Sequence, residues 1–200
     1  MIDTISMVAV LSTVGVMAIA AWFGFWPIMT KVRRSRIKHR HLSKSGQEIQ
    51  NHLLATQIPA RSLGTEVESY GDDGTTLTLT APLDRNQNVH GTGFAGSLYS
   101  VAVLTAYYLI FDYLQRNDLS HFTLVAKSGS ISYKKPVTTR IRATSHLPSP
   151  YELKRFQSTL QEFRKATLNA TGQIVQDSTV ACEYTIELCV FEPRSKTKQT

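Results

Sequence analysis

The sequence is poor in cysteine, with only Cys182 and Cys189 among its 200 residues. Both lie in the strand-like run STVACEYTIELCVF, an odd number of residues apart, so their side chains point to opposite faces of a strand and cannot pair with each other there. This excludes a disulfide framework as the basis of the fold. It is also typical of a protein from a reducing compartment.

Charge is missing from the N-terminal segment. No Asp, Glu, Lys or Arg occurs between residues 4 and 30, and residues 5–26 read ISMVAVLSTVGVMAIAAWFGFW. As a helix, this run would span about 33 Å, which matches a hydrocarbon core of about 30 Å. Trp22 and Trp26 lie at its C-terminal end, where aromatic residues favour the membrane interface. We therefore predict a transmembrane anchor over residues 1–30. A cleavable signal peptide is the alternative, but the N-terminus carries Asp3 without a basic residue and the run is too long.

Acidic residues are missing from the segment that follows. Residues 31–44 contain seven of the 22 basic residues and no acid, whereas 15 basic residues stand against 14 acidic residues beyond position 44. The net charge of +7 is therefore local, which argues against nucleic-acid binding by the folded part. We predict a basic juxtamembrane linker over residues 31–45. By the positive-inside rule, such a linker leaves the N-terminus outside and makes the chain a single-pass membrane protein with a cytoplasmic C-terminal domain.

Membrane lipid is thus the first partner that the sequence indicates. We expect residues 5–29 to lie in the hydrocarbon region. The basic run 31–44 is expected to contact anionic headgroups.

A second segment without charge, residues 86–111, is also long enough to cross a bilayer. Residues 88–111 of this segment read NVHGTGFAGSLYSVAVLTAYYLIF. A helix that is apolar on most sides lies either in lipid or inside a protein core. Strand patterns occur on both sides of this segment, and a second span would place them on opposite sides of the membrane. We therefore predict that this segment is the core helix of a folded domain.

Alternating apolar and polar residues predict six strands around this helix. The first two are joined by Gly71-Asp72-Asp73-Gly74, a hairpin turn, and the alternation from Thr76 to Thr80 indicates a half-buried strand. The last strand places Val180, Cys182, Tyr184, Ile186, Leu188 and Val190 on one face. The six predicted strands cover residues 64–70, 75–83, 121–133, 138–146, 165–176 and 178–191.

Two further helices are predicted. The first covers residues 45–59 and ends at Pro59. The second begins with Ser149, Pro150 and Glu152, which form a capping box with proline at the first helical position. Its apolar side chains are spaced to form one stripe that packs on the core: Leu153, Phe156, Leu160 and Phe163. The polar residues 193–200 are expected to form a disordered tail.

These elements predict an α+β domain over residues 46–192, in which one antiparallel sheet wraps around a long central helix. That is the hotdog fold. The run APLDRNQNVHGTGFAGSLYSVA resembles the start of the central helix in YiiD C-terminal-type thioesterase domains of the hotdog superfamily. The run ISYKKPV, with Tyr133, Pro136 and Val137, resembles the strand and bend of hotdog thioesterases. The resemblance covers residues 47–191.

The resemblance implies an acyl-CoA thioesterase that acts as a homodimer, with each site lined by both subunits. Its substrate would be acyl-CoA or a related thioester, which water hydrolyses without a cofactor or a metal. The basic residues that could meet the phosphates of coenzyme A are Lys134, Lys135, Arg140 and Arg142, although a basic solvated strand edge explains them equally well.

The residues at the start of the predicted helix suit this chemistry. Glycine lets the backbone approach a ligand closely, and the first-turn amides of a helix are unpaired and carry positive potential. A thioester oxyanion at this position would be stabilised by such amides, and an upstream side chain could orient a water or accept its proton. The candidate catalytic residues are Asn88, His90, Ala95, Gly96 and Ser97. The candidate substrate-binding residues are Gly91, Thr92, Gly93, Phe94 and Tyr99.

The simpler interpretation is a tight glycine turn in which Asn88 caps the helix and His90 is an ordinary loop histidine. Many hotdog thioesterases also carry an acid about two turns into the central helix, whereas residues 97–106 contain none and Val103 stands near that position. The general base therefore stays open between His90, Asp84 and a water held by Asn88 and Ser97. We expect Asp112 to face solvent at the far end of the helix.

Two other functions remain open. A non-catalytic acyl-binding or scaffolding module would keep the fold and lack the acid. A hotdog dehydratase is less favoured, because it needs a histidine and an acid across the dimer and only the histidine is present.

Overall fold

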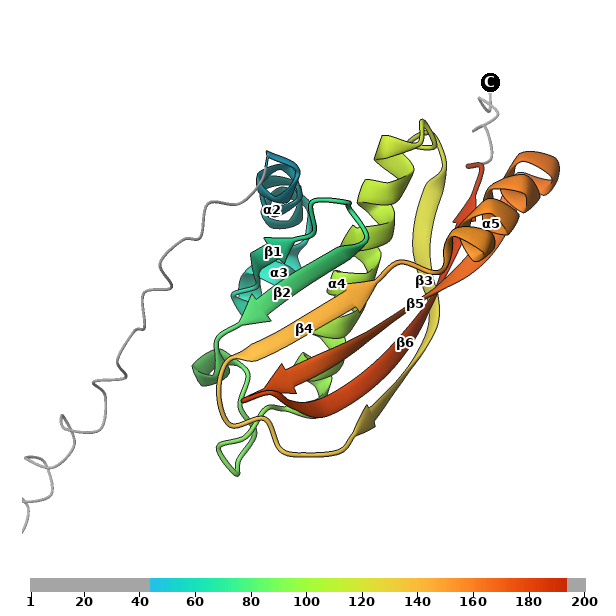
Figure 1. Cartoon of the computed structure of the whole chain (residues 1–200). Coiled ribbons are helices and arrows are strands. Elements are labelled where there is room, and N and C mark those ends of the chain that lie inside the picture. The colour runs from blue at the N-terminus through green and yellow to red at the C-terminus, as the bar shows by residue number, and fades with distance from the viewer. Residues whose placement is uncertain (1–43, 194–200) are drawn as a thin grey trace, which may run out of the picture. The chain divides into compact units, whose positions relative to one another are not determined.

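The computed structural model describes residues 44–193 (Figure 1). The predicted anchor, residues 31–43 of the predicted linker and residues 194–200 of the predicted tail lie outside the described residues. Lys44 and Ser45, the last residues of the predicted linker, already belong to helix α2 (Lys44–Thr56).

Six strands form one antiparallel sheet, as the alternation of residues predicted. Along the sheet the order is β1-β2-β4-β5-β6-β3, so the strand that follows the central helix lies at one edge. All of the neighbouring strands are antiparallel. The strands are β1 (Glu66–Tyr70), β2 (Thr76–Ala81), β3 (Thr123–Tyr133), β4 (Ile141–His146), β5 (Lys165–Gln176) and β6 (Thr179–Phe191).

Helix α4 (Ala95–Arg116) is the central helix of this domain. It contacts β2, β3, β4, β5 and β6, and Val101, Ala102, Ala106 and Leu109 are fully buried. In the part of the chain that the structure describes, α4 is the one helix long and apolar enough to cross a membrane, and most of its apolar stretch is buried inside the domain. The prediction of a core helix in the segment without charge is confirmed.

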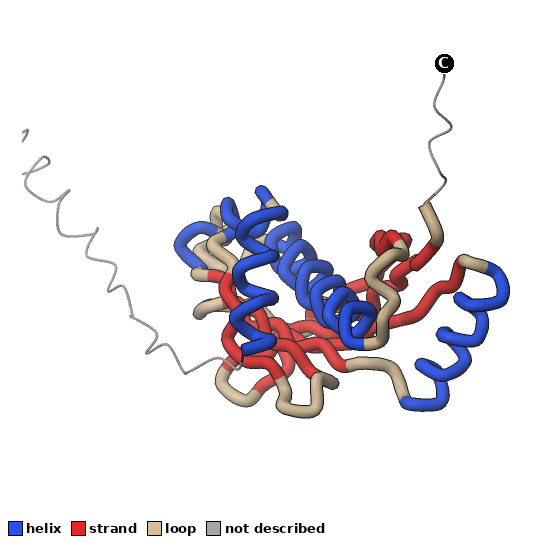
Figure 2. Tube along the Cα trace, turned by 90° about the horizontal axis from the view of Figure 1, so that it is seen from above, coloured by secondary structure: helices blue, strands red, loops and turns tan. Residues whose placement is uncertain are grey.

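Helix α2 lies on the same side of the sheet as α4 (Figure 2). It buries Ile49 and Leu53 and contacts β1 and α4. It ends at Thr56, and a short helix, α3 (Ile58–Leu63), follows. Pro59 therefore lies in the first turn of α3, where its missing N–H is tolerated, instead of ending the first helix as predicted.

Strand β5 shows the alternation that anchors the sheet to the helix. Ala166, Leu168, Ala170, Gly172 and Ile174 are buried, whereas the residues that alternate with them are at least partly exposed. Strand β2 differs from the predicted half-buried pattern, because its threonine face is buried as well. The hydroxyls of Thr78 and Thr144 lie 2.9 Å apart and bond to each other across the strand pair, which satisfies both polar groups.

Helix α5 (Pro150–Phe163) begins with the predicted capping box. The Ser149 side chain accepts from the Glu152 N–H at 3.3 Å, and the Glu152 carboxylate accepts from the Ser149 N–H at 2.9 Å. Phe156 and Leu160 are buried as expected. Phe163 is 65% exposed, so its assignment to the core stripe is wrong. It is the last residue of the helix, directly before the chain turns at Arg164 into β5.

The expectation that Asp112 faces solvent is also wrong. Asp112 is buried, and its carboxylate accepts hydrogen bonds from the Tyr70 hydroxyl and, at 2.7 Å, from Arg116 Nε. Arg116 also donates to the Gly74 carbonyl at 2.8 Å. Burial and then the hydrogen bond to Asp112 raise the pKa of the Tyr70 phenol, which therefore stays a donor. This network joins the far end of α4 to the β1–β2 hairpin.

Candidate functional site at the start of the central helix

A buried asparagine, Asn86, precedes the loop that leads into α4. Its role was not predicted from the sequence. Asn86 follows the 3-10 helix η2 (Leu83–Arg85), and its side-chain amide donates to the carbonyls of Leu63 at 2.8 Å and Pro82 at 2.7 Å. Its own carbonyl accepts from the Phe94 N–H at 2.7 Å. Asn86 thus fixes the position of Phe94, the residue directly before α4.

The loop between Asn86 and α4 is built by Asn88. Its Oδ1 accepts from the N–H groups of His90 at 2.9 Å and Thr92 at 3.2 Å, and its N–H donates to the Thr92 carbonyl at 2.7 Å. Gly91 lies in this turn at φ +75°, a conformation that glycine adopts without strain. The simpler interpretation of a tight glycine turn is correct for this loop, but Asn88 does not cap the helix, since the N-cap residue is Phe94.

His90 lies at the exposed tip of this loop, next to Val89, which is 95% exposed. No hydrogen bond of its side chain occurs within residues 44–193. Asp84 in η2 is exposed as well. Neither of these two candidate bases is therefore held by a partner side chain of the described domain.

The start of α4 has unpaired amides. Phe94 provides no side-chain cap, and the first helical hydrogen bond runs from the Leu98 N–H to the Phe94 carbonyl at 3.0 Å. No acceptor within the described chain bonds the N–H groups of Ala95, Gly96 and Ser97. These three amides and the helix dipole form a site of positive potential. Such a site suits a carbonyl oxygen that becomes negative in a reaction.

The first turn is covered by an aromatic ring. A Cβ atom on Gly96 would lie 2.5 Å from a ring carbon of Phe94, so the absence of a side chain lets this ring rest on the helix. Phe94 itself is 54% exposed. Gly96 therefore allows the Phe94 ring to approach the helix backbone closely. A ligand bound at the amides of α4 would lie against this ring.

The bend after β3 holds the start of α4 from the other side. The Tyr133 hydroxyl donates to the Ala95 carbonyl at 3.0 Å, and the Gly93 N–H donates to the Val137 carbonyl at 2.7 Å. Burial, and then Cys182 and Tyr99, raise the pKa of the Tyr133 phenol, so it remains a donor at neutral pH. This role of Tyr133 was not predicted, because Tyr133 and Ala95, which the hydrogen bond joins, are far apart in the sequence.

Tyr99 lies one turn further along α4, and its hydroxyl reaches β3. A Cβ atom on Gly129 would lie only 2.6 Å from this oxygen. Of the predicted residues, the structure brings together Gly93, Phe94, Ala95, Gly96 and Ser97, with Tyr99 beside them. It leaves His90 and Gly91 at the loop tip, and it uses Asn88 and Thr92 to hold that loop together.

Neither cysteine is suited to act as a nucleophile. Both are unpaired and buried, and burial raises the pKa of the Cys182 thiol to about 11. At neutral pH that thiol is protonated and a poor nucleophile.

Most of the basic residues considered for phosphate binding have acidic partners. Lys134 pairs with Glu183 at 2.5 Å, Arg140 lies 3.8 Å from Glu66, and Arg142 bonds to Glu68. These pairs favour the interpretation of a solvated strand edge. Lys135 is exposed and forms no ion pair within residues 44–193.

The fold and the site together define a hotdog domain of the thioesterase type. The chain belongs to the family described as "Putative thioesterase (yiiD_Cterm)", which matches residues 46–191. This confirms the resemblance seen at the start of the central helix.

Solved structures support the same class. A protein of unknown function from Chlorobaculum tepidum is 26% identical, with a TM-score of 0.69, and the match covers 74% of this chain and 94% of that one. A protein from Shewanella oneidensis, described as a "putative thioesterase", is 25% identical with a TM-score of 0.64, over 74% and 98% of the two chains. A Pseudomonas aeruginosa protein at 20% identity, a TM-score of 0.60 and coverage of 74% and 96% shows the fold alone.

The loop before α4 offers a direct test of the role of Asn88. We expect Asn88→Ala to release the amides of His90 and Thr92, because the carbonyl of this side chain accepts from both. Hydrogen exchange at these two amides should become at least tenfold faster, with little change in the core strands. Asn169→Ala, an exposed asparagine on β5, is the matched control. Unchanged exchange at both amides would contradict the role assigned to Asn88.

Proposed function

We propose that this protein is an acyl-CoA thioesterase that acts at the start of α4, and that residues 1–30 anchor it in a membrane with the folded domain in the cytoplasm. The observation that carries the catalytic part is the uncapped first turn of α4, whose amides lie free beside Phe94 and Tyr133. Membership of the thioesterase family supports a thioester as the substrate.

In the proposed reaction, the carbonyl oxygen of the thioester accepts hydrogen bonds from the N–H groups of Ala95 and Gly96. Water attacks the carbonyl carbon, and the oxyanion that forms is stabilised by these amides. The C–S bond then breaks, a fatty acid is released, and the departing thiolate of coenzyme A takes up the proton that the water lost. A base must accept that proton in the first step.

The proposal includes a homodimer, because β3 leaves one edge of the sheet open. This strand bonds to β6 on one side, and no other strand of residues 44–193 pairs with it. It spans 11 residues, and most of them are exposed, including Val125 and Tyr133. Long open edges of this kind are usually paired or protected. Pairing of β3 with β3 of a second copy would be isologous.

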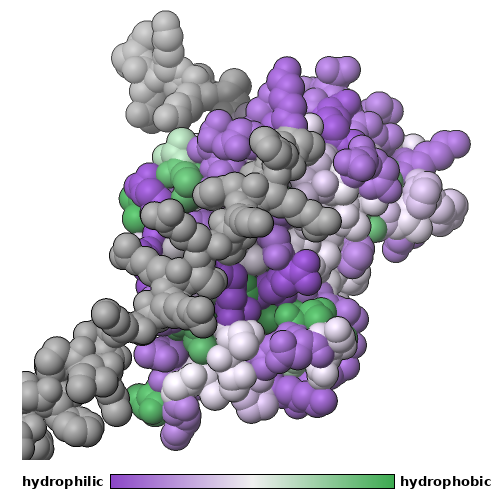
Figure 3. Space-filling model, turned by 60° about the vertical axis from the view of Figure 1, so that its left-hand side comes forward, coloured by the Kyte–Doolittle hydropathy of each residue, from purple (hydrophilic) through white to green (hydrophobic). Residues whose placement is uncertain are grey.

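The part of the opposite side that is visible in Figure 3 shows no large hydrophobic surface. In the view of Figure 3, which turns the left-hand side of Figure 1 forward, the described atoms are mostly hydrophilic and the hydrophobic residues lie in small separate groups. The β3 edge is therefore the surface that we assign to the dimer.

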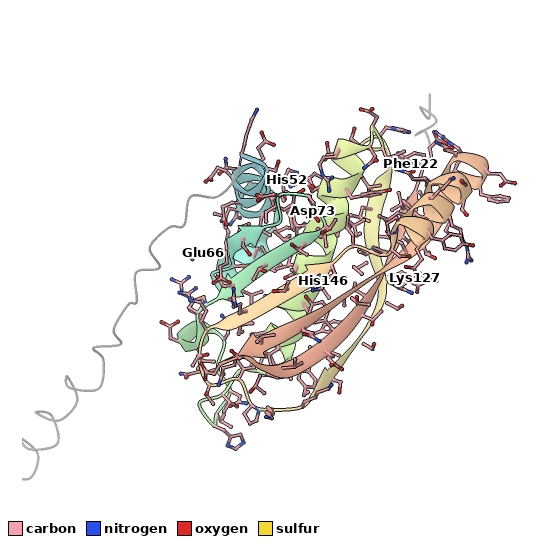
Figure 4. All side chains as sticks on the ribbon, viewed as in Figure 1. His52, Glu66, Asp73, Phe122, Lys127 and His146 are labelled. Atoms are coloured by element: carbon pink, nitrogen blue, oxygen red, sulfur yellow. The ribbon has the colours of Figure 1, made fainter. Side chains whose placement is uncertain are left out.

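Release of free thiol from acyl-CoA by the purified full-length protein tests the catalytic proposal. We expect turnover by the wild-type protein and its loss in Gly96→Val, because a side chain there displaces Phe94 and obstructs the amides. His90→Ala should lower turnover by about 10² to 10⁴ if this histidine is the base, and the acidic limb of the pH–rate profile should vanish with it. His146→Ala, an exposed histidine on β4 that is labelled in Figure 4, is the control and should retain full activity.

A non-catalytic acyl-binding module is the second candidate. It is favoured by one observation, since no acid or histidine within the described domain forms a hydrogen bond with the first turn of α4 in a single protomer. Saturable binding of acyl-CoA without any release of thiol would establish this candidate and refute the enzyme.

The membrane proposal has an independent test. Full-length protein should remain in the membrane fraction after carbonate extraction, whereas a chain without residues 1–30 should be released as a soluble protein. A reporter fused after Thr200 should be active in the cytoplasm. A shortened chain that still resists extraction would contradict the assignment of the anchor to residues 1–30.

A further inference from the structure

A cavity of about 220 Å³ lies at the far end of α4, between this helix and the start of β3. Five of its eight lining residues are aromatic or aliphatic, and three of these, Leu114, Phe122 and Leu124, are less than a tenth exposed. Phe122, labelled in Figure 4, stands near the C-terminal end of α4. The exposed residues Gln115 and Ser120 also line this space, which we call the distal cavity.

A line of partly exposed apolar side chains leads to the distal cavity from the first turn of α4. Tyr99, Val103, Tyr107 and Phe111 recur at every fourth residue, so they lie on one face of the helix. Each packs against the core without being fully buried, whereas most of their neighbours in the helix are buried. Tyr107 and Phe111 are themselves walls of the distal cavity.

The length of this path fits a particular ligand. Tyr107 and Phe111 follow Gly96 by 11 and 15 residues, which corresponds to about 16 and 22 Å along the helix axis. An extended chain advances by about 1.2 Å per covalent bond. An acyl chain whose carbonyl lies at the amides of Ala95 and Gly96 would therefore reach the distal cavity with about 14 to 18 carbons.

We propose that the distal cavity receives the methyl end of a long acyl chain, so that the substrate is a long-chain thioester of about 14 to 18 carbons. This inference rests on the proposed function, because it takes the first turn of α4 as the position of the carbonyl. The chain would lie along Tyr99, Val103 and Tyr107 and would bury its methylenes against them. Each methylene buried in this way tightens binding by about fourfold.

A second cavity, which is larger than the distal cavity, does not suit such a chain. It has a volume of about 540 Å³ and lies over β3, β4, β5 and β6, and polar side chains such as Ser130, Glu183 and Thr185 line it. A hydrocarbon chain there would bury these polar groups without hydrogen bonds, which is unfavourable. The distal cavity, whose lining is mainly aromatic and aliphatic, is the better receptor for the end of the chain.

The test uses acyl-CoA analogues in which a methylene group replaces the thioester sulfur, so that the carbonyl is kept and hydrolysis is blocked. The full-length protein should bind the 16-carbon analogue at least 100-fold more tightly than the 6-carbon analogue. Gln115→Trp and, separately, Ser120→Trp place an indole at the cavity from exposed positions. Each should weaken binding of the long analogue at least tenfold and leave the short one within twofold. Gln161→Trp, at an exposed position on α5, is the control and should change neither.

The outcomes separate this inference from the proposed function. Equal affinity of the wild-type protein for the two analogues, or equal weakening of both by the tryptophan variants, would overturn the inference. Loss of the dimer in these variants, measured by light scattering in detergent, would show that a partner subunit fills the cavity and would overturn it too. Binding that depends on chain length but releases no thiol would refute the proposed enzyme and support the acyl-chain site. Release of thiol without any dependence on chain length would support the enzyme and refute the acyl-chain site.

Discussion

Burial of α4 against the sheet is the interaction on which the other features depend. The helix supplies the apolar surface that five strands cover, and its two ends are held by polar contacts. At the far end, the Tyr70–Asp112–Arg116 network ties it to the first hairpin. At the start, Asn86 and Tyr133 hold the residues around the first turn from two sides. A helix fixed in this way can keep its unpaired amides in one position relative to the strand that follows it.

The same constraint explains why the proposed chemistry is assigned to the first turn. A helix usually has a side chain that caps its first amides, but the N-cap residue here is Phe94, which has no acceptor in its side chain. Most of the remaining surface of α4 is buried, so its polar groups have no access to a substrate. A carbonyl oxygen can reach the free amides only where Phe94 and Tyr133 leave them exposed. In the proposed mechanism, the amides that position the carbonyl come from one protomer, whereas no acid or histidine of the described domain forms a hydrogen bond with the first turn of α4.

Most of the fold could be predicted from the sequence, because each element carries its own periodic pattern. The strands follow from alternation, as in β5, and the capping box of α5 follows from Ser149 and Glu152, which are three residues apart. The errors occur where a tertiary contact overrides the local pattern. Asp112 is polar and near the end of a helix, but Tyr70, a partner 42 residues away, draws it into the interior. Phe163 has the right spacing for the core, but it lies at the helix end where no core remains.

The site could be predicted only in part for the same reason. The glycines and the helix start form a local motif, and the amides lie where that motif indicates. The roles of Asn86 and Tyr133 depend on carbonyls that other segments contribute, and no spacing in the sequence reveals them. Asn88 has the right chemistry for orienting water, yet the structure shows that its side chain is engaged by its own loop.

The amide resonances of Ala95 and Gly96 test the central claim most directly. In ¹⁵N-labelled full-length protein titrated with the non-hydrolysable acyl-CoA analogue, these two N–H signals should show the largest shifts, in the direction expected of a new hydrogen bond to the carbonyl. Unchanged signals at both residues at saturation, with the main shifts on the outer polar face around Ser130 and Thr185, would contradict the account.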